Sequence, residues 1–126
     1  MRLKFELEYT LNCSPKVLFS RLCTPEGLSE WFADNVNVDG DIFTFFWDSS
    51  ASEARLSALK ENKLVRFEWL NLENEDENYF EFCINIDELT GDLALIISDF
   101  ADPEEKKDSI SLWNSQVADL KRLLGI

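Results

Sequence analysis

The chain has 126 residues, of which 25 are acidic and 12 are basic, so its formal net charge is −13. Such an excess of carboxylates repels phosphate backbones and anionic lipid surfaces, which argues against nucleic-acid binding and against membrane binding. The hydrophobic content of 45% and the length predict a single domain over residues 1–126 that buries its own core without disulfides or a metal.

The first residues, the lack of a long apolar run and the cysteines predict a cytoplasmic location. Residues 1–6 alternate charged and apolar side chains and lack the continuous apolar stretch of a signal peptide. No apolar run approaches the roughly 20 residues of a membrane-spanning helix. Cys13, Cys23 and Cys83 are odd in number and lack CxxC spacing, as expected of reduced thiols.

The first elements in chain order are a strand and two short helices. Residues 2–11 alternate apolar and polar side chains, which is typical of a half-buried strand. Ser14-Pro15 and Thr24-Pro25 each place a capping hydroxyl before a proline, which predicts two short helices in succession.

A series of strands is expected from about residue 35 onward, which in hairpin succession predicts an antiparallel sheet. Glu61-Asn62 and Thr90-Gly91-Asp92 are predicted turns, and the acidic segment 73–78 is predicted to be an exposed loop. The last strand is apolar enough to predict cover on both faces. The predicted strands are 42–47, 54–59, 64–70, 79–87 and 93–98, and the alternation is weaker in 54–59 than in the others.

A long amphipathic helix is predicted to close the chain. Asp102-Pro103-Glu104-Glu105 is expected to begin it, so that all three prolines would mark the starts of helices. One side of this helix is predicted to be apolar and consists of Ile110, Trp113, Val117, Leu120 and Leu124.

The sequence contains no recognisable catalytic or metal-binding motif. It has no histidine, which removes Ser-His-Asp and Cys-His catalysis and most catalytic zinc sites. Residues 35–46 begin like a calcium loop but have Asn35 at the first ligand position and Phe46 at the twelfth, so Asp39-Gly40 is better interpreted as a hairpin turn. Glu68 is expected to face solvent beside Arg66. No catalytic residue, metal site or cofactor is predicted, and the sequence favours a non-enzyme without deciding the question.

The aromatic residues of the strands have two interpretations. Phe43, Phe45 and Trp47 form one group, and Phe67, Trp69, Phe80 and Phe82 form another. They either pack as an ordinary core or line a cavity for a small molecule, since such cavities have mainly apolar walls. Trp31-Phe32 likewise either plugs the sheet edge or forms a lid, and the plug is the simpler interpretation.

The segment Thr24-Pro25-Glu26-Gly27-Leu28-Ser29-Glu30-Trp31-Phe32 resembles the "TPE.L..W" segment of START-like proteins in the SRPBCC superfamily. That superfamily includes polyketide cyclases and relatives of the heat-shock-protein ATPase activator. A small bacterial START-like group is also similar in residues 80–82, 87–92 and 95–97. The resemblance implies an α+β helix-grip fold, with a curved antiparallel sheet wrapped around the C-terminal helix, and a cavity for a hydrophobic ligand.

These observations lead to a non-enzymatic protein that binds a small hydrophobic molecule between sheet and C-terminal helix. The alternative is a protein-interaction or co-chaperone-like module whose acidic surface meets a basic partner. An enzymatic role requires a buried titratable group in the cavity, and a homodimer through a strand edge is also compatible with the sequence. The residues predicted to line the cavity are Trp31, Phe43, Phe45, Phe67, Phe82, Trp113 and Val117.

Overall fold

The computed structural model describes residues 2–70 and 78–126 and confirms the predicted α+β helix-grip fold. Over these residues the chain forms seven strands and three helices. In chain order they are β1 (Leu3–Leu11), α1 (Pro15–Cys23), α2 (Pro25–Leu28), β2 (Asn35–Asp39), β3 (Ile42–Trp47), β4 (Ser50–Lys60), β5 (Leu64–Trp69), β6 (Tyr79–Ile86), β7 (Leu93–Ala101) and α3 (Lys106–Leu124).

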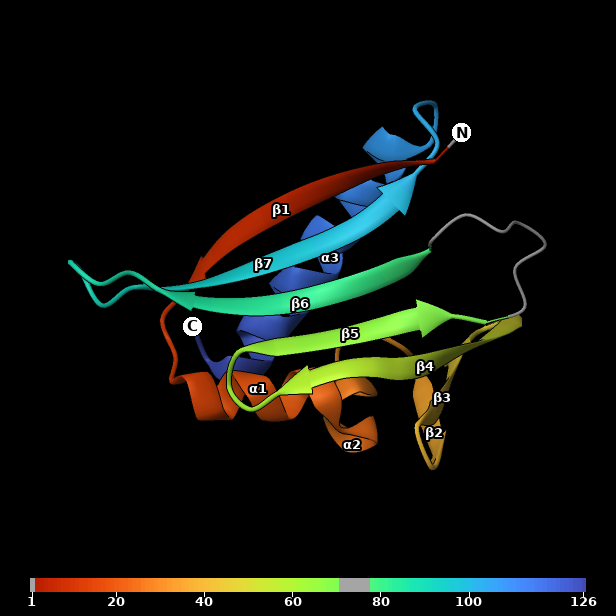
Figure 1. Cartoon of the computed structure of the whole chain (residues 1–126), viewed down its shortest axis with the longest axis horizontal. Helices are drawn as coiled ribbons and strands as arrows, with labels where there is room; N and C mark the ends of the chain where they lie inside the picture. The colour runs from red at the N-terminus through yellow and green to blue at the C-terminus, as the bar shows by residue number, and fades with distance from the viewer. Residues whose placement is uncertain (1, 71–77) are drawn as a thin grey trace.

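The strands form one antiparallel sheet in the order β1-β7-β6-β5-β4-β3-β2. Successive strands from β2 to β7 pair as a meander, and β1 joins at the far edge by pairing with β7. The sheet curves, and α3 crosses behind it with α1 and α2 lying beside α3 (Figure 1). The three helices therefore cover the same concave face.

Prolines mark the starts of two helices but not of the third. Pro15 and Pro25 each occupy the first helical turn, after Ser14 and Thr24, whose side chains cap the helices. The prediction that α3 begins at residues 102–105 is wrong. Residues 103–105 form a turn in which Glu105 N and Lys106 N donate to the Asp102 carbonyl at 2.9 and 3.0 Å, and the helix begins at Lys106.

Two further predictions concern the strands and a loop between them. The predicted exposed loop at residues 73–78 lies outside the described residues except for Asn78, which is buried; its carbonyl accepts a 3.0 Å hydrogen bond from Trp69 N, which extends the β5–β6 pairing. The prediction that residues 93–98 are covered on both faces is wrong as well. Ala94 and Ile96 are only half-buried, because the helices cover the opposite face of β7.

The core lies between the concave face of the sheet and the helices. Phe45, Phe67, Phe80 and Phe82 have exposed fractions of 1% or less and contact one another ring to ring. Burial of each such side chain contributes about 1.5–3 kcal/mol. The predicted apolar side of α3 faces these rings, with Trp113, Val117 and Leu120 buried and Ile110 and Leu124 partly buried.

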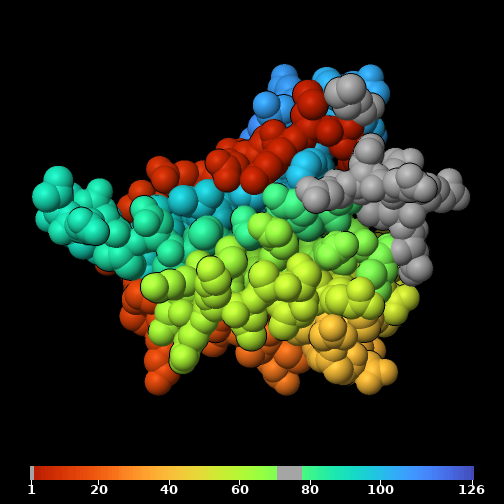
Figure 2. Space-filling view, in the orientation of Figure 1, coloured from red at the N-terminus to blue at the C-terminus, as the bar shows by residue number. Residues whose placement is uncertain are grey.

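The outer face of the sheet is polar and open to solvent, and Figure 2 shows it with most of α3 hidden behind. Arg66 donates to Glu81 on the neighbouring strand at 2.9 and 3.1 Å, and its guanidinium lies over the Tyr79 ring. Glu68 is exposed, as predicted. The hairpin between β6 and β7 projects beyond the sheet, and Leu89 at its tip is 96% exposed.

Across residues 2–70 and 78–126, none of the helices combines the length and apolar character needed to cross a bilayer.

Candidate functional site

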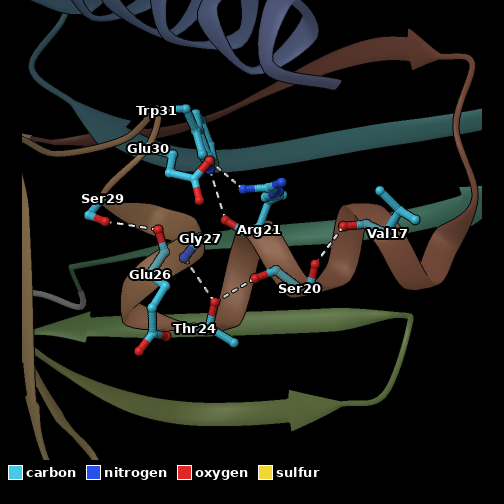
Figure 3. Close-up of polar contacts among 9 residues, drawn as sticks. All are labelled: Val17, Ser20, Arg21, Thr24, Glu26, Gly27, Ser29, Glu30 and Trp31. Atoms are coloured by element: carbon cyan, nitrogen blue, oxygen red, sulfur yellow. Dashed lines mark hydrogen bonds and ion pairs between the residues drawn. The ribbon is translucent and has the colours of Figure 1, made fainter. Parts of the chain in front are cut away.

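The segment that carries the START-like resemblance is a structural junction between α1 and α2 (Figure 3). The Thr24 hydroxyl donates to the Ser20 carbonyl at 2.6 Å and accepts from Gly27 N at 3.0 Å, so it ends one helix and caps the next. Gly27 lies against α1 so closely that a Cβ there would be 2.3 Å from the Ser20 carbonyl oxygen and 2.7 Å from Arg21 Cα. The glycine is therefore required by close packing of two backbones.

The same junction anchors the tryptophan of the motif. Trp31 Nε1 donates to the Arg21 carbonyl at 2.8 Å, and the Trp31 side chain is only 5% exposed (Figure 3). Arg21 also forms an ion pair with Glu30. Phe32 follows directly and is equally buried. Both rings thus occupy the positions that the plug interpretation expects, and Trp31 fixes where Phe32 enters the core.

The strand topology brings side chains of three strands to one end of the sheet. In an antiparallel sheet alternate strands run in the same direction, so the C-terminal ends of β3, β5 and β7 all lie at the same end of the sheet. Side chains alternate between faces along each strand. Near this end the concave face carries Trp47 of β3, Trp69 of β5 and Asp99 of β7, and Ala101 follows Asp99 on the same face.

The first half of α3 lies over this end and leaves a cavity of about 310 Å³. We call this cavity the mouth. Its walls enclose it only partly. It is large enough for a small molecule, because an engineered apolar cavity of roughly 150 Å³ in another protein binds benzene. The residues that line the mouth are Phe32, Trp47, Trp69, Asp99, Ser109, Leu112, Trp113 and Gln116.

Phe32 links the walls of the mouth. Its ring stacks on Trp113 with centroids 5.6 Å apart and meets Trp47 edge to face at the same distance. Its carbonyl accepts hydrogen bonds from Trp47 Nε1 and from Gln116 Nε2, each at 2.9 Å. Phe32, a single residue in the segment between α2 and β2, therefore holds β3 and α3 in a fixed relation, and the mouth is preformed.

Asp99 places a carboxylate in this aromatic surrounding. Trp113 Nε1 donates to Asp99 Oδ2 at 2.8 Å, and Phe100 N donates to Asp99 Oδ1 at 2.7 Å. Burial raises the pKa of the Asp99 carboxyl above its ordinary value, whereas these two hydrogen bonds and the charge of Arg2 oppose the rise. Asp99 is thus a partly buried acceptor with its own supporting donors.

A larger and more open hollow adjoins the mouth. Its volume is about 740 Å³, and it shares Trp47, Trp69, Asp99 and Ser109 with the mouth. Asn78 also lines it, and within the described residues the buried Oδ1 of Asn78 has no hydrogen-bond partner. A buried acceptor without a donor is costly, so this atom is a second place where a ligand can gain a hydrogen bond.

The seven residues predicted to line a cavity come together in the core, but only Trp113 lines the mouth. Phe32, which also lines the mouth, belongs to the same core cluster. The other six are buried in this cluster, and their contact with a ligand stays a prediction: Trp31, Phe43, Phe45, Phe67, Phe82 and Val117.

Sequence reasoning missed Asp99, although the alternation of β7 contains the signal. Leu93, Leu95 and Ile97 are buried on the concave face, so the same period of two places Asp99 on that face. An inward carboxylate at the end of an apolar strand is the kind of feature that marks a binding site. Gln116, one helical turn from Trp113, was missed for lack of any distinguishing pattern.

The described residues contain no group of three or more acidic or cysteine side chains placed to hold a metal ion. The three cysteines are free thiols, and burial raises the pKa of each. Raised thiol pKa values disfavour the reactive thiolate.

The comparison with family models finds one match, to the START-like superfamily domain, over residues 1–126. A search of curated proteins finds no match. Among solved structures, the solution structure of BfR322 from Bacteroides fragilis is 41% identical, with a TM-score of 0.69, and the alignment covers 99% of this chain and 93% of that one.

Two further solved structures share the fold at low sequence identity. The Aha1 dimer from Colwellia psychrerythraea is 15% identical with a TM-score of 0.80, and the alignment covers 94% of this chain and 93% of that one. The protein MLL2253 from Mesorhizobium loti is 18% identical with a TM-score of 0.78, and the alignment covers 98% and 97% of the two chains. These likenesses describe architecture only.

Proposed function

Because this chain belongs to the START-like superfamily, we propose that it binds a small, largely apolar molecule in the mouth and acts without catalysis. The observation that carries the proposal is a preformed cavity of about 310 Å³ with three tryptophans and Phe32 among its lining residues. Ligand sites are typically concave, mainly apolar and supplied with a few fixed polar groups. The mouth has each of these properties.

The size and shape of the mouth support a compact ligand. Its volume lies near the lower end of the roughly 300–1,000 Å³ range of small-molecule sites. Two of the core residues predicted from the sequence hold tryptophans of the mouth in place, because Phe45 stacks on Trp47 and Phe82 meets Trp113 edge to face. A molecule of one or two rings would cover the exposed faces of Trp47 and Trp69, which are half-buried.

Binding is favoured over catalysis by the polar groups at the site. Among the described residues that line the mouth, Asp99 is the one titratable side chain, and each of its oxygens accepts a hydrogen bond from the protein. Acid–base catalysis usually needs a second group in reach of the substrate. We also propose that the protein acts in the cytoplasm, which its three free thiols support.

The test uses a neutral fluorescent probe, N-phenyl-1-naphthylamine, whose emission rises in apolar surroundings. We expect saturable binding by the unchanged protein and loss of at least about tenfold in affinity for Ser109→Phe, because the new ring would fill the mouth. Ser111→Phe places the same ring on an exposed position of the same helix and is the control. Equal binding by both variants, or no saturable binding at all, would refute the proposal.

A protein-interaction role is the second candidate, supported by the net charge of −13 and by the fold shared with the Aha1 dimer. In that case a basic partner protein would be captured at low salt and released as salt rises, because exposed charges are screened over roughly 8–10 Å. Capture unaffected by salt would argue against an electrostatic interaction. Size-exclusion chromatography with light scattering would show in the same samples whether the chain forms a homodimer.

A further inference from the structure

The mouth has one charged side chain among aromatic walls. Asp99 is the only charged residue among those that line it in the described part of the chain. Trp47, Trp69 and Trp113 lie around the same cavity with Phe32. The faces of aromatic rings carry partial negative charge and attract cations, most strongly in the case of tryptophan. The aromatic rings and the carboxylate of Asp99 therefore both favour a positively charged ligand.

Three hydrogen-bond donors that line the mouth are used within the protein. Trp47 Nε1 and Gln116 Nε2 both donate to the carbonyl of Phe32, and Trp113 Nε1 donates to Asp99. In the adjoining hollow, the buried acceptor Asn78 Oδ1 has no donor within the described residues. A ligand that donates a hydrogen bond would therefore find an acceptor beside the mouth.

Charges around the mouth add to this preference. Arg2 lines the adjoining hollow, where its Nη2 donates to the Phe100 carbonyl at 3.2 Å, and its charge opposes a cation. Glu53 lines the same hollow and brings a second carboxylate. Among the described residues that line the two cavities, Asp99 and Glu53, the second of which has an interaction partner of its own, outnumber the one guanidinium, and the whole chain carries a charge of −13. The local and the overall potential both attract positive charge.

We propose that the mouth selects an organic cation, an amine or quaternary ammonium group on a small apolar body. The cationic group lies against the tryptophan faces near Asp99, and the apolar body covers the remaining ring surface. This inference rests on the ligand-binding function proposed above and adds the charge of the ligand to it.

The test compares two probes that differ in one atom. Choline carries a quaternary nitrogen, and 3,3-dimethylbutan-1-ol has a carbon in its place and is neutral. Titration of each probe, followed by the indole N–H signals in NMR spectra, gives two dissociation constants. We expect choline to bind about fivefold tighter or more, from the usual strength of cation–aromatic contacts.

Two variants and a control trace this preference to the mouth. Asp99→Asn removes the carboxylate, and we expect the ratio of the two affinities to fall by at least about twofold, although the tryptophan faces keep part of the preference. Glu8→Gln removes one exposed carboxylate elsewhere and should leave the ratio unchanged. Trp69→Leu removes one half-buried aromatic face and should weaken choline more than the alcohol. If Asp99→Asn does not fold, Trp69→Leu decides the question.

The outcomes separate this inference from the function on which it rests. Equal binding of choline and the alcohol, or a preference for choline that survives both Asp99→Asn and Trp69→Leu, would overturn the inference and leave the ligand-binding function standing. Binding of N-phenyl-1-naphthylamine without binding of choline would do the same. Failure of all three probes to bind would overturn both proposals.

Discussion

Replacement of Gly27 by alanine tests how the junction between α1 and α2 is built. The added Cβ would lie 2.3 Å from the Ser20 carbonyl oxygen, 2.7 Å from Arg21 Cα and 2.8 Å from Thr24 Oγ1, whereas ordinary contact begins at 3.4 Å. Two of these atoms belong to the backbone, so no side-chain rotation relieves the overlap. The two helices must move apart.

The magnitude follows from the interactions that such a movement disturbs. Overpacking of this kind costs about 1–3 kcal/mol. The hydrogen bonds of Thr24 to Gly27 N and to the Ser20 carbonyl are strained at the same time, each worth roughly 0.5–1.5 kcal/mol. Alanine recovers at most about 1 kcal/mol through its higher helix propensity. We expect a net loss on the order of 2–3 kcal/mol in the free energy of unfolding.

Urea unfolding followed by tryptophan fluorescence measures this loss, and calorimetry should show Tm lower by roughly 10 °C. Glu26→Ala adds an alanine to an exposed position of the same helix and should change the free energy of unfolding by less than about 0.5 kcal/mol. If Gly27→Ala is as stable as the unchanged protein or more stable, helix propensity outweighs packing and the close-approach argument is wrong.

Further predictions concern the cap, the core and the carboxylate. Thr24→Ala should cost about 0.5–2 kcal/mol in urea unfolding and Thr24→Ser clearly less, because serine keeps the capping oxygen; equal losses would contradict the capping role. Leu120→Ala should cost about 2–5 kcal/mol, against less than about 1 kcal/mol for Leu123→Ala on the exposed side of α3, and similar values would mean that α3 is not seated on the core. The raised pKa of Asp99 means that folding favours its protonated form, so the contribution of Asp99 to stability declines as pH rises from about its ordinary pKa of 3.8 through its folded pKa. The free energy of unfolding of the unchanged protein should therefore fall over that interval relative to Asp99→Asn. A difference between the two proteins that stays constant with pH would contradict the shift.

Local patterns in the sequence were sufficient to predict most of the elements. Alternation identified residues 2–11 as a strand, and hydroxyl–proline pairs located the starts of α1 and α2. The same reasoning failed at Pro103, because a proline in a turn and a proline in the first turn of a helix look alike in sequence. The structure distinguishes them, because the regular helix begins only at Lys106.

The mouth was less accessible to sequence reasoning, because it depends on which strand ends meet. Trp47, Trp69 and Asp99 are far apart in the chain and come together through the pairing order of β3, β5 and β7. Alternation alone indicates that each faces inward, yet it also marks Phe45 and Phe67, which are fully buried in the core. What separates the two sets of residues is how far each lies from the end of the sheet, and this distance depends on the register of the strands.

The central claim, that a ligand binds in the mouth, is tested most directly by the four tryptophan indole signals in ¹H–¹⁵N NMR spectra during titration with N-phenyl-1-naphthylamine. We predict large, saturable shifts for Trp47, Trp69 and Trp113, which line the mouth, and a clearly smaller shift for Trp31, whose Nε1 is bound to the Arg21 carbonyl at the helix junction. Shifts that are largest for Trp31, or no saturable shift in any of the four, would contradict the account.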